Sequence, residues 1–138
     1  MSSLTARILP FFLFCSSFVI LYLASLLEPD SSGLGTHQQL GLEPCGFLTR
    51  FQIPCMMCGM TTSFSLYMHV HIQEGIQNQP FSLFLFIGTV YIFFLSLLDL
   101  VYPRSRVTRF LDFIQSLRPA FYVIALFLFL VSWALKAL

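Results

Sequence analysis

Charged residues are scarce in this chain of 138 residues: Asp, Glu, Lys and Arg make up 9% of it, and the formal net charge is +1. A soluble domain usually carries about 25% charged residues, so this chain lacks the polar surface of a soluble particle. The seven Lys and Arg residues are dispersed, which excludes a phosphate-binding footprint and hence a nucleic-acid partner. Because 57% of the residues are apolar, disorder is excluded as well. The composition therefore indicates an integral membrane protein, small enough to form one domain over residues 1–138.

Motifs of the common catalytic sites are missing too. Ser, His and Asp do not converge in a catalytic pattern, and the sequence has no glycine-rich phosphate loop. It also lacks pore-lining acids and an inverted repeat of the kind found in transporters. We therefore expect a non-enzymatic protein.

Three apolar segments are long enough to cross a bilayer, which takes about 20 residues. They cover residues 8–27, 81–102 and 119–135. Because backbone groups have no water partners in lipid, each segment should be a helix, and the fold class should be all-α. The first segment follows Arg7 and resembles a signal peptide, but it is long and no small-x-small cleavage site follows it, so we expect it to be retained.

The arginines predict the orientation of these spans. The connection at 103–118 contains four arginines, whereas the connection at 28–80 contains only Arg50. Positive charge favours the cytoplasmic side, so the amino terminus and residues 103–118 should lie inside, and residues 28–80 outside.

Residues 103–118 also show a helical repeat of apolar residues, which predicts a short amphipathic helix on the inner membrane surface. Its arginines should contact anionic lipid headgroups, at about 1 kcal/mol each. These arginines are Arg104, Arg106, Arg109 and Arg118. Asp99, near the end of the second span, should reach headgroups or pair with Arg104 or Arg106.

In the outer segment, apolar and polar residues alternate at helical spacing from about residue 59 to 77. Gly59 and Thr61 stand at the start of this pattern. We expect one amphipathic helix here, lying in the outer headgroup region, with Ser65 and His69 on its polar face and Tyr67 on its apolar face.

Three cysteines precede that helix. Cys55 and Cys58 form a C-x-x-C pair where the helix begins, a position that favours a thiolate, and Cys45 can return to the pair if the segment between them is a loop. Three thiols could hold a metal ion, with a fourth ligand from His37, His69 or His71. Zinc and copper are both compatible with these ligands, since Met56, Met57 and Met60 would add thioethers that suit Cu(I).

Other states of the cysteines stay open. An oxidising exterior would form a disulfide, either Cys55–Cys58 or Cys45 to one of them, and would stabilise the segment by about 2–3 kcal/mol. Plain reduced thiols at the interface are the third alternative. Cys15 lies inside the first span and should behave as a small apolar residue.

The cysteine motif, followed by Gln79-Pro80 before a span, resembles the domain-of-unknown-function 2752 family of small bacterial membrane proteins. The residues that match the family's motif are Cys45, Pro54, Cys55, Cys58, Gly59 and Thr61. The sequence departs from it at Gly46, Phe51, Gln52, Met56, Thr62 and Gln79. The resemblance implies a location in the bacterial inner (cytoplasmic) membrane, and the family name supplies no activity.

Two functions follow as hypotheses. The first is an accessory or assembly subunit of a larger membrane complex, contacting a membrane-protein partner or a second copy within the lipid bilayer, with the cysteines as a structural clip. The second is a metal-binding or thiol-redox membrane protein that uses Cys45, Cys55 and Cys58.

Overall fold

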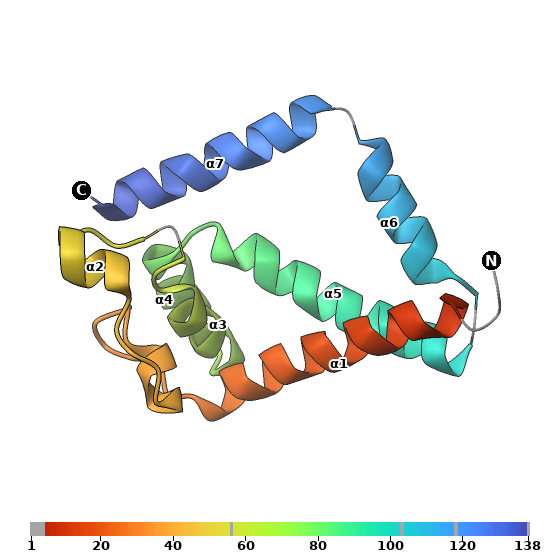
Figure 1. Cartoon of the computed structure of the whole chain (residues 1–138), viewed down its shortest axis with the longest axis horizontal. Coiled ribbons are helices and arrows are strands. Elements are labelled where there is room, and N and C mark those ends of the chain that lie inside the picture. Colours follow the sequence, from red (N-terminus) through yellow and green to blue (C-terminus); the bar gives the residue numbers. More distant parts are fainter. Residues whose placement is uncertain (1–4, 56, 103, 118, 138) are drawn as a thin grey trace.

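The computed structural model describes residues 5–55, 57–102, 104–117 and 119–137, and all the regular secondary structure in these residues is helical (Figure 1). The α-helices are α1 (Thr5–Leu26), α2 (Gly46–Phe51), α3 (Met60–Met68), α4 (Ile72–Asn78), α5 (Ser82–Val101), α6 (Arg106–Ser116) and α7 (Pro119–Ala137), and a 3-10 helix, η1 (Thr36–Leu40), precedes α2. The predicted all-α class is confirmed.

Two of these helices are long and apolar enough to cross a membrane by themselves. They are α1, over Arg7–Leu26, and α5, over Ser82–Val101. The third predicted span, residues 119–135, is helical as part of α7. Helices α6 and α7 together are long and apolar enough to cross a membrane, but the two are bent by 88° relative to each other. The chain therefore has two candidate membrane-spanning helices, or three if the bent pair is one span.

Helices α1 and α5 pack against each other near the start of α1 and the end of α5 and diverge towards their other ends, where α3 contacts both (Figure 1). Stacked rings join them, with the centroids of Phe14 and Phe93 5.2 Å apart. Ser17 on α1 and Ser96 on α5 are buried, and each donates its hydroxyl hydrogen to a carbonyl of its own helix. Small residues of this kind let two helices approach closely in a membrane.

The structure differs from the single amphipathic helix predicted over residues 59–77. The structure has two helices there, α3 and α4, with a break at residues 69–71. Val70 in the break has φ 67°, a left-handed conformation that ends a right-handed helix. The chain reverses at this point, and α4 packs against α3.

Helix α3 is also more deeply buried than an interfacial helix would be. Every residue from Thr62 to Tyr67 is buried, including Ser65, which was expected on the polar face. The Ser65 hydroxyl donates to the carbonyl oxygen of Leu27, and the Tyr67 hydroxyl lies 2.8 Å from that of Ser82. Because neighbouring helices satisfy these hydroxyl groups, the polar side of α3 can be buried against protein.

At the opposite end of α5, a buried acid holds the start of α6. Asp99 Oδ2 accepts a hydrogen bond of 2.8 Å from the backbone N–H of Val107. Asp99 Oδ1 lies 3.8 Å from the guanidinium of Arg106, so the predicted ion pair forms with Arg106.

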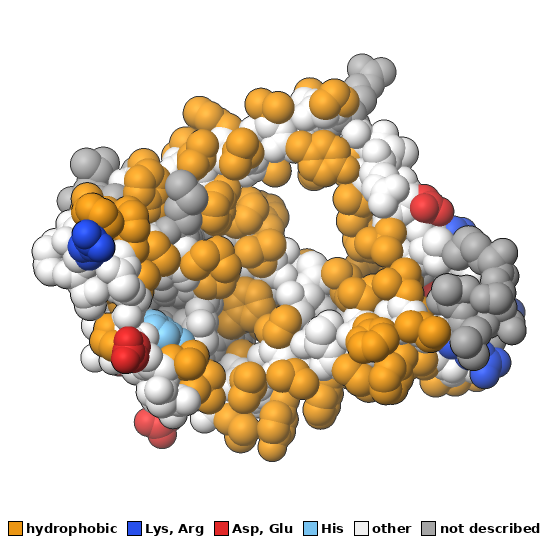
Figure 2. Space-filling model, in the orientation of Figure 1, with side chains coloured by type: hydrophobic (Ala, Val, Ile, Leu, Met, Phe, Trp, Pro, Cys, Tyr) orange, Lys and Arg blue, Asp and Glu red, His pale blue; other side chains and the backbone are white. Residues whose placement is uncertain are grey.

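Helix α7 meets the rest of the chain mainly near its two ends. Trp133 Nε1 donates to the carbonyl oxygen of Pro54 at 2.8 Å, and the rings of Phe81 and Phe129 are 5.0 Å apart. At the other end, the Tyr122 hydroxyl donates to the carbonyl oxygen of Ile114. Between these ends, Figure 2 shows an opening bounded by α7, α6 and α5 and lined largely by hydrophobic side chains.

Candidate functional site: a three-thiol cluster

Two turns bring the three cysteines together. Cys45 is the N-cap of α2, and α2 ends at Gln52, which has φ 57° and turns the chain back towards Cys55. The N–H of Cys58 then bonds the carbonyl oxygen of Cys55 at 3.0 Å, which closes the C-x-x-C turn. Gly59 follows with φ 85°, a conformation that strains any residue with a Cβ, and α3 begins at Met60. Glycine at position 59 therefore lets the helix start directly after Cys58.

The three sulfur atoms lie within 4.8 Å of one another. The sulfurs of Cys55 and Cys58 are 3.2 Å apart. Cys58 is buried, while Cys45 and Cys55 are half-buried. Among the described residues this is the one group of three or more His, Cys, Asp or Glu side chains with metal-ligand spacing. Cys15 lies in α1, outside the group.

The thiols differ in acidity. The backbone N–H of Leu48, followed by the thiols of Cys58 and Cys55, lowers the pKa of Cys45 to about 7. Burial, followed by the interactions with Cys55 and Cys45, raises the pKa of Cys58 to about 12. Near neutral pH the cluster therefore offers one reactive thiolate at Cys45 and a protonated thiol at Cys58.

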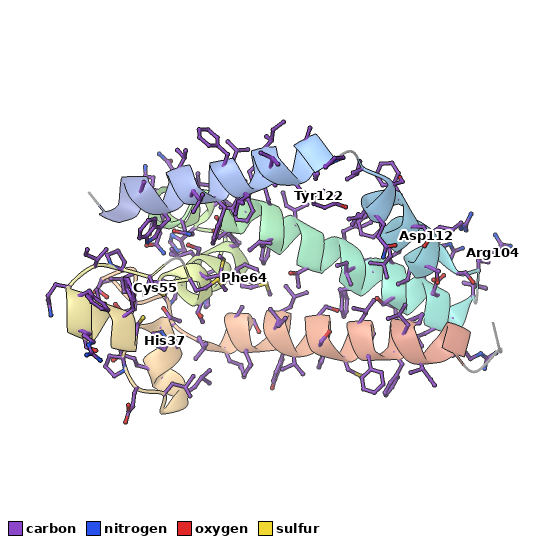
Figure 3. The ribbon with its side chains drawn as sticks, turned by 45° about the horizontal axis from the view of Figure 1, so that its top comes forward. His37, Cys55, Phe64, Arg104, Asp112 and Tyr122 are labelled. Carbon is purple, nitrogen blue, oxygen red and sulfur yellow. The ribbon has the colours of Figure 1, made fainter. Side chains whose placement is uncertain are left out.

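A cavity of about 210 Å³ adjoins the sulfurs, and His37 lines it together with all three cysteines. His37 lies in η1, which is fixed to α3 by a buried hydrogen bond of 2.9 Å between the hydroxyls of Thr36 and Thr62. Figure 3 shows His37 and Cys55 at the same end of the molecule, on different segments. The His37 ring lies outside the group of atoms within 4.8 Å, so a rotation of its side chain would be needed for it to share a metal with the sulfurs.

The structure does not bring the other two predicted histidines to the cluster. His69 Nδ1 lies 2.8 Å from the carbonyl oxygen of Ser65, and His71 Nδ1 lies 3.0 Å from Glu74 Oε1. The described residues that line the cavity include neither histidine.

The methionines predicted as possible copper ligands do not all lie at the thiol cavity. Met57 lines the cavity, Met60 packs in the core against Ala24 and Phe64, and Met56 lies outside the described residues. Thr61, the other residue of the predicted helix start, lines the cavity on α3.

Three of the four predicted headgroup-binding arginines are described, and they lie in α6 or between α5 and α6. Arg104 and Arg109 are exposed, and Figure 3 shows Arg104 at the end opposite Cys55. Arg106 is turned towards Asp99 and also donates to the carbonyl oxygen of Leu98 at 3.3 Å. Arg118 lies outside the described residues.

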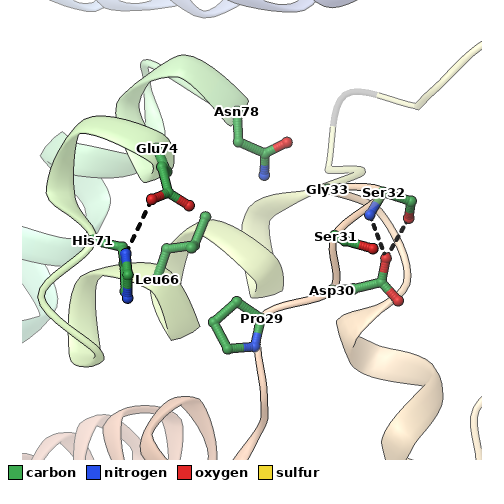
Figure 4. Close-up of a pocket in the computed structure, with 9 residues that line it drawn as sticks. All are labelled: Pro29, Asp30, Ser31, Ser32, Gly33, Leu66, His71, Glu74 and Asn78. Atoms are coloured by element: carbon green, nitrogen blue, oxygen red, sulfur yellow. Dashed lines mark hydrogen bonds and ion pairs between the residues drawn. The ribbon is translucent and has the colours of Figure 1, made fainter.

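A second, polar cavity of about 520 Å³ lies between the loop after α1 and helix α4 (Figure 4). Asp30 and Glu74 line it, but each carboxylate already has a local partner: Asp30 accepts hydrogen bonds from the N–H and hydroxyl of Ser32, and Glu74 pairs with His71. The hydroxyl and N–H of Ser32 lower the pKa of Asp30. Each carboxylate therefore has a structural role within its own segment.

Sequence reasoning missed several contacts that position the cluster. The amide of Asn78 donates to the carbonyl oxygen of Gly59 and to the Ser63 hydroxyl, both at 3.0 Å, and so fixes the start of α3. Trp133 bonds the carbonyl of Pro54, the residue before Cys55. These contacts join residues 15 to 79 positions apart, and no local pattern signals them.

Residues 45–93, about a third of the chain, match the sequence profile of a family described as "Protein of unknown function (DUF2752)". The match contains the three clustered cysteines, α3, α4 and the first half of α5, and it confirms the resemblance that the cysteine motif predicted. Comparisons with curated proteins and with solved structures gave no match.

Proposed function

We propose that this protein is a small, non-enzymatic membrane protein in which Cys45, Cys55 and Cys58 bind one zinc ion as a structural clip. The supporting observation is the convergence of three sulfurs within 4.8 Å. Zinc–sulfur bonds of about 2.3 Å in a tetrahedron hold two sulfurs about 3.8 Å apart. That spacing lies between the 3.2 Å that separates the sulfurs of Cys55 and Cys58 and the 4.8 Å limit of the group, so small side-chain movements would complete it.

His37 is the best candidate for the fourth ligand. It lines the cavity beside the sulfurs, and its ring has no hydrogen-bond partner among the residues that the structure describes. Three thiolates and one imidazole form a ligand set common in structural zinc sites, whereas Cu(I) would draw on thioethers, of which Met57 alone among the described methionines lines the cavity. The ion would join the residue before α2 to the start of α3, and so fix the whole outer loop.

Elemental analysis of the purified full chain, combined with thiol counting, tests this proposal. We expect about one equivalent of zinc, lost in Cys58→Ser and retained in Cys15→Ser, since Cys15 lies in α1 away from the cluster. One equivalent of copper would contradict the choice of metal. Metal-free protein with two blocked thiols would contradict metal binding and leave a disulfide clip.

A thiol-redox role is the second candidate, because the sulfurs of Cys55 and Cys58 are only 3.2 Å apart and Cys45 offers a thiolate near neutral pH. Forming one disulfide from two of these thiols would release two protons and pass two electrons to an external acceptor. The same thiol count separates the zinc clip from the redox pair. For a redox pair, the number of titratable thiols rises from two to four when reductant is added.

We propose that the protein, with its cysteine loop held by the metal ion, acts as an accessory or assembly subunit in a larger membrane complex. Support comes from the apolar side chains that α7 exposes, among them Phe121, Ile124 and Phe127, and from the apolar opening beside that helix (Figure 2). Solubilisation in a mild detergent followed by sizing tests this role. A single monomeric species that copurifies with nothing would contradict it.

For its location we propose the bacterial inner membrane, with the amino terminus in the cytoplasm and the cysteine cluster outside. The separation of the arginine-rich α5–α6 junction from the cluster along α5 supports this orientation (Figure 3). A membrane-impermeant thiol reagent should label Cys45 in intact cells after metal chelation. Labelling only after the cytoplasmic side is opened would reverse the topology.

A further inference from the structure

An apolar groove of about 450 Å³ lies beside the thiol cavity. Leu23 of α1, Leu27 directly after that helix, Phe64 of α3 and Leu85 of α5 form much of its wall. Because α1 and α5 are the two helices that are long and apolar enough to cross a membrane alone, a groove walled by both would open towards lipid once they span a bilayer. Its volume is in the range of small-molecule sites, which is about 300–1,000 Å³.

The groove and the thiol cavity share part of one wall. His37, Met57 and Thr61 line both spaces. A molecule that enters the groove from the bilayer would therefore contact residues that also contact the space around the sulfurs.

The lining of the groove selects against charge. Among the described residues that line it, none is Asp, Glu, Lys or Arg, so a phosphate, carboxylate or ammonium head would lose its hydration without a partner. Thr89 satisfies its own hydroxyl by donating to the carbonyl oxygen of Leu85 at 2.8 Å. The half-buried His37 ring and Thr61 hydroxyl remain, and neither has a hydrogen-bond partner among the described residues.

We infer that this groove binds an uncharged, lipid-soluble molecule with a hydrocarbon tail and a carbonyl head. The tail lies along Leu23, Phe64 and Leu85, and the carbonyl oxygen accepts hydrogen bonds from Thr61 and His37. The His37 contact is compatible with the zinc site proposed above, because an imidazole that binds a metal through one nitrogen usually donates its other N–H to an oxygen. The groove itself does not depend on the metal.

A matched pair of photoactivatable probes tests this inference. Hexadecan-2-one and tetradecane-1-sulfonate share a 14-carbon alkyl tail, and with a diazirine at the same carbon of that tail they differ only in the head. The full chain is reconstituted in phosphatidylcholine nanodiscs, illuminated with either probe and digested, and the adducts are mapped by mass spectrometry. Labelling of the groove is expressed relative to labelling of Leu126, an exposed residue of α7 outside the groove.

The ketone should label Leu23, Phe64 or Leu85 at least fivefold more than the sulfonate does. Thr61→Val, which removes one hydroxyl and keeps the side-chain volume, should lower ketone labelling about fivefold, the value of one neutral hydrogen bond. Leu85→Trp should lower it further by filling the groove, whereas Leu126→Trp should leave it unchanged. Equal labelling by the two probes, or equal labelling of the groove and α7, would overturn the inference.

Zinc measured in the same samples separates this inference from the proposed function. Zinc-free protein that still shows the ketone preference would refute the zinc clip and support the groove. Zinc-loaded protein without that preference would refute the groove and leave the clip intact.

Discussion

Asp99 offers a direct test of how the junction between α5 and α6 is held. Helix α6 begins after Ser105, whose φ of 53° accompanies an N-cap without a side-chain hydrogen bond. The carboxylate of Asp99, eight residues before Val107, supplies the missing acceptor from α5. Asp99→Ala would remove it, while Val107, which is 2% exposed, would keep its N–H away from water.

The size of the loss follows from these contacts. A hydrogen bond to a charged group contributes about 1.5–3 kcal/mol, and the partly exposed ion pair with Arg106 adds no more than about 1 kcal/mol. We expect Asp99→Ala to lower the free energy of unfolding by about 2–4 kcal/mol. Asp99→Asn keeps a neutral acceptor for the Val107 N–H, so it should lose about half as much.

Unfolding can be followed in detergent micelles by the helical circular-dichroism signal during denaturant titration, with wild type and variants prepared identically. Asp112→Ala is the matched control: this carboxylate is exposed on α6, at the same end of the molecule (Figure 3), and it should change stability by less than about 0.5 kcal/mol. Equal stability of Asp99→Ala and wild type would refute this account of the junction, and so would a loss from Asp112→Ala as large as that from Asp99→Ala.

Three further predictions concern the cysteine end of the protein. In metal-free protein, the rate of Cys45 alkylation should rise with pH through a midpoint near 7, since only the thiolate reacts. Cys58, with a pKa of about 12, should stay unmodified below about pH 9. Equal modification of both cysteines, measured by peptide mass spectrometry, would contradict this prediction. Trp133 is the single tryptophan of the chain, and it donates a hydrogen bond to the carbonyl oxygen of Pro54 beside the cluster. Removing bound zinc should therefore increase acrylamide quenching of its fluorescence. Unchanged quenching would show that α7 is held independently of the cluster. Gly75→Ala would place a Cβ 2.3 Å from Tyr67 Cε1 and should lower the free energy of unfolding by about 1–3 kcal/mol. Gly88→Ala on α5, where nothing lies within 4 Å of the added Cβ, should not lower it. Equal effects of the two substitutions would mean that α4 can shift away from α3.

The apolar spans were the easiest part of the fold to predict, because a run of apolar residues needs no distant partner to be recognised. Residues 119–135 form the predicted helix as part of α7, and the number of candidate spans is two, or three if α6 and α7 together form one. Whether a helix crosses a bilayer or lies bent beside it depends on packing, which periodicity does not report.

Residues 59–77 show a second limit of sequence patterns. Ser65 was expected to face water, but its hydroxyl bonds the carbonyl of Leu27, 38 residues away, and the side chain is fully buried. The break at Val70 was not predicted either, since a β-branched residue is rarely left-handed and nothing adjacent in the sequence marks it. Tertiary contacts overrode local amphipathicity here.

For the candidate site, spacing was informative for the cysteines and uninformative for the histidines. Two cysteines three positions apart must be close at a turn, and a loop after α2 returns the chain to Cys45. His69 and His71 were nearer in sequence to Cys58 than His37 is, yet the reversal at Val70 leaves them outside the cavity. His37 lines it because Thr36 is bonded to Thr62, a pairing that only the fold reveals.

The polar contacts of α3 also set an order of events during synthesis. When α3 leaves the ribosome, its partners in α1 and η1 already exist, but Ser82, which bonds Tyr67, is made 15 residues later. Until α5 is in place, the hydroxyl groups of α3 lack a complete set of protein partners and are better solvated by water than by lipid. The thiols at the start of α3 should therefore reach their final arrangement only after the second span has inserted, which makes assembly of the cluster a late, extramembrane step under the proposed topology.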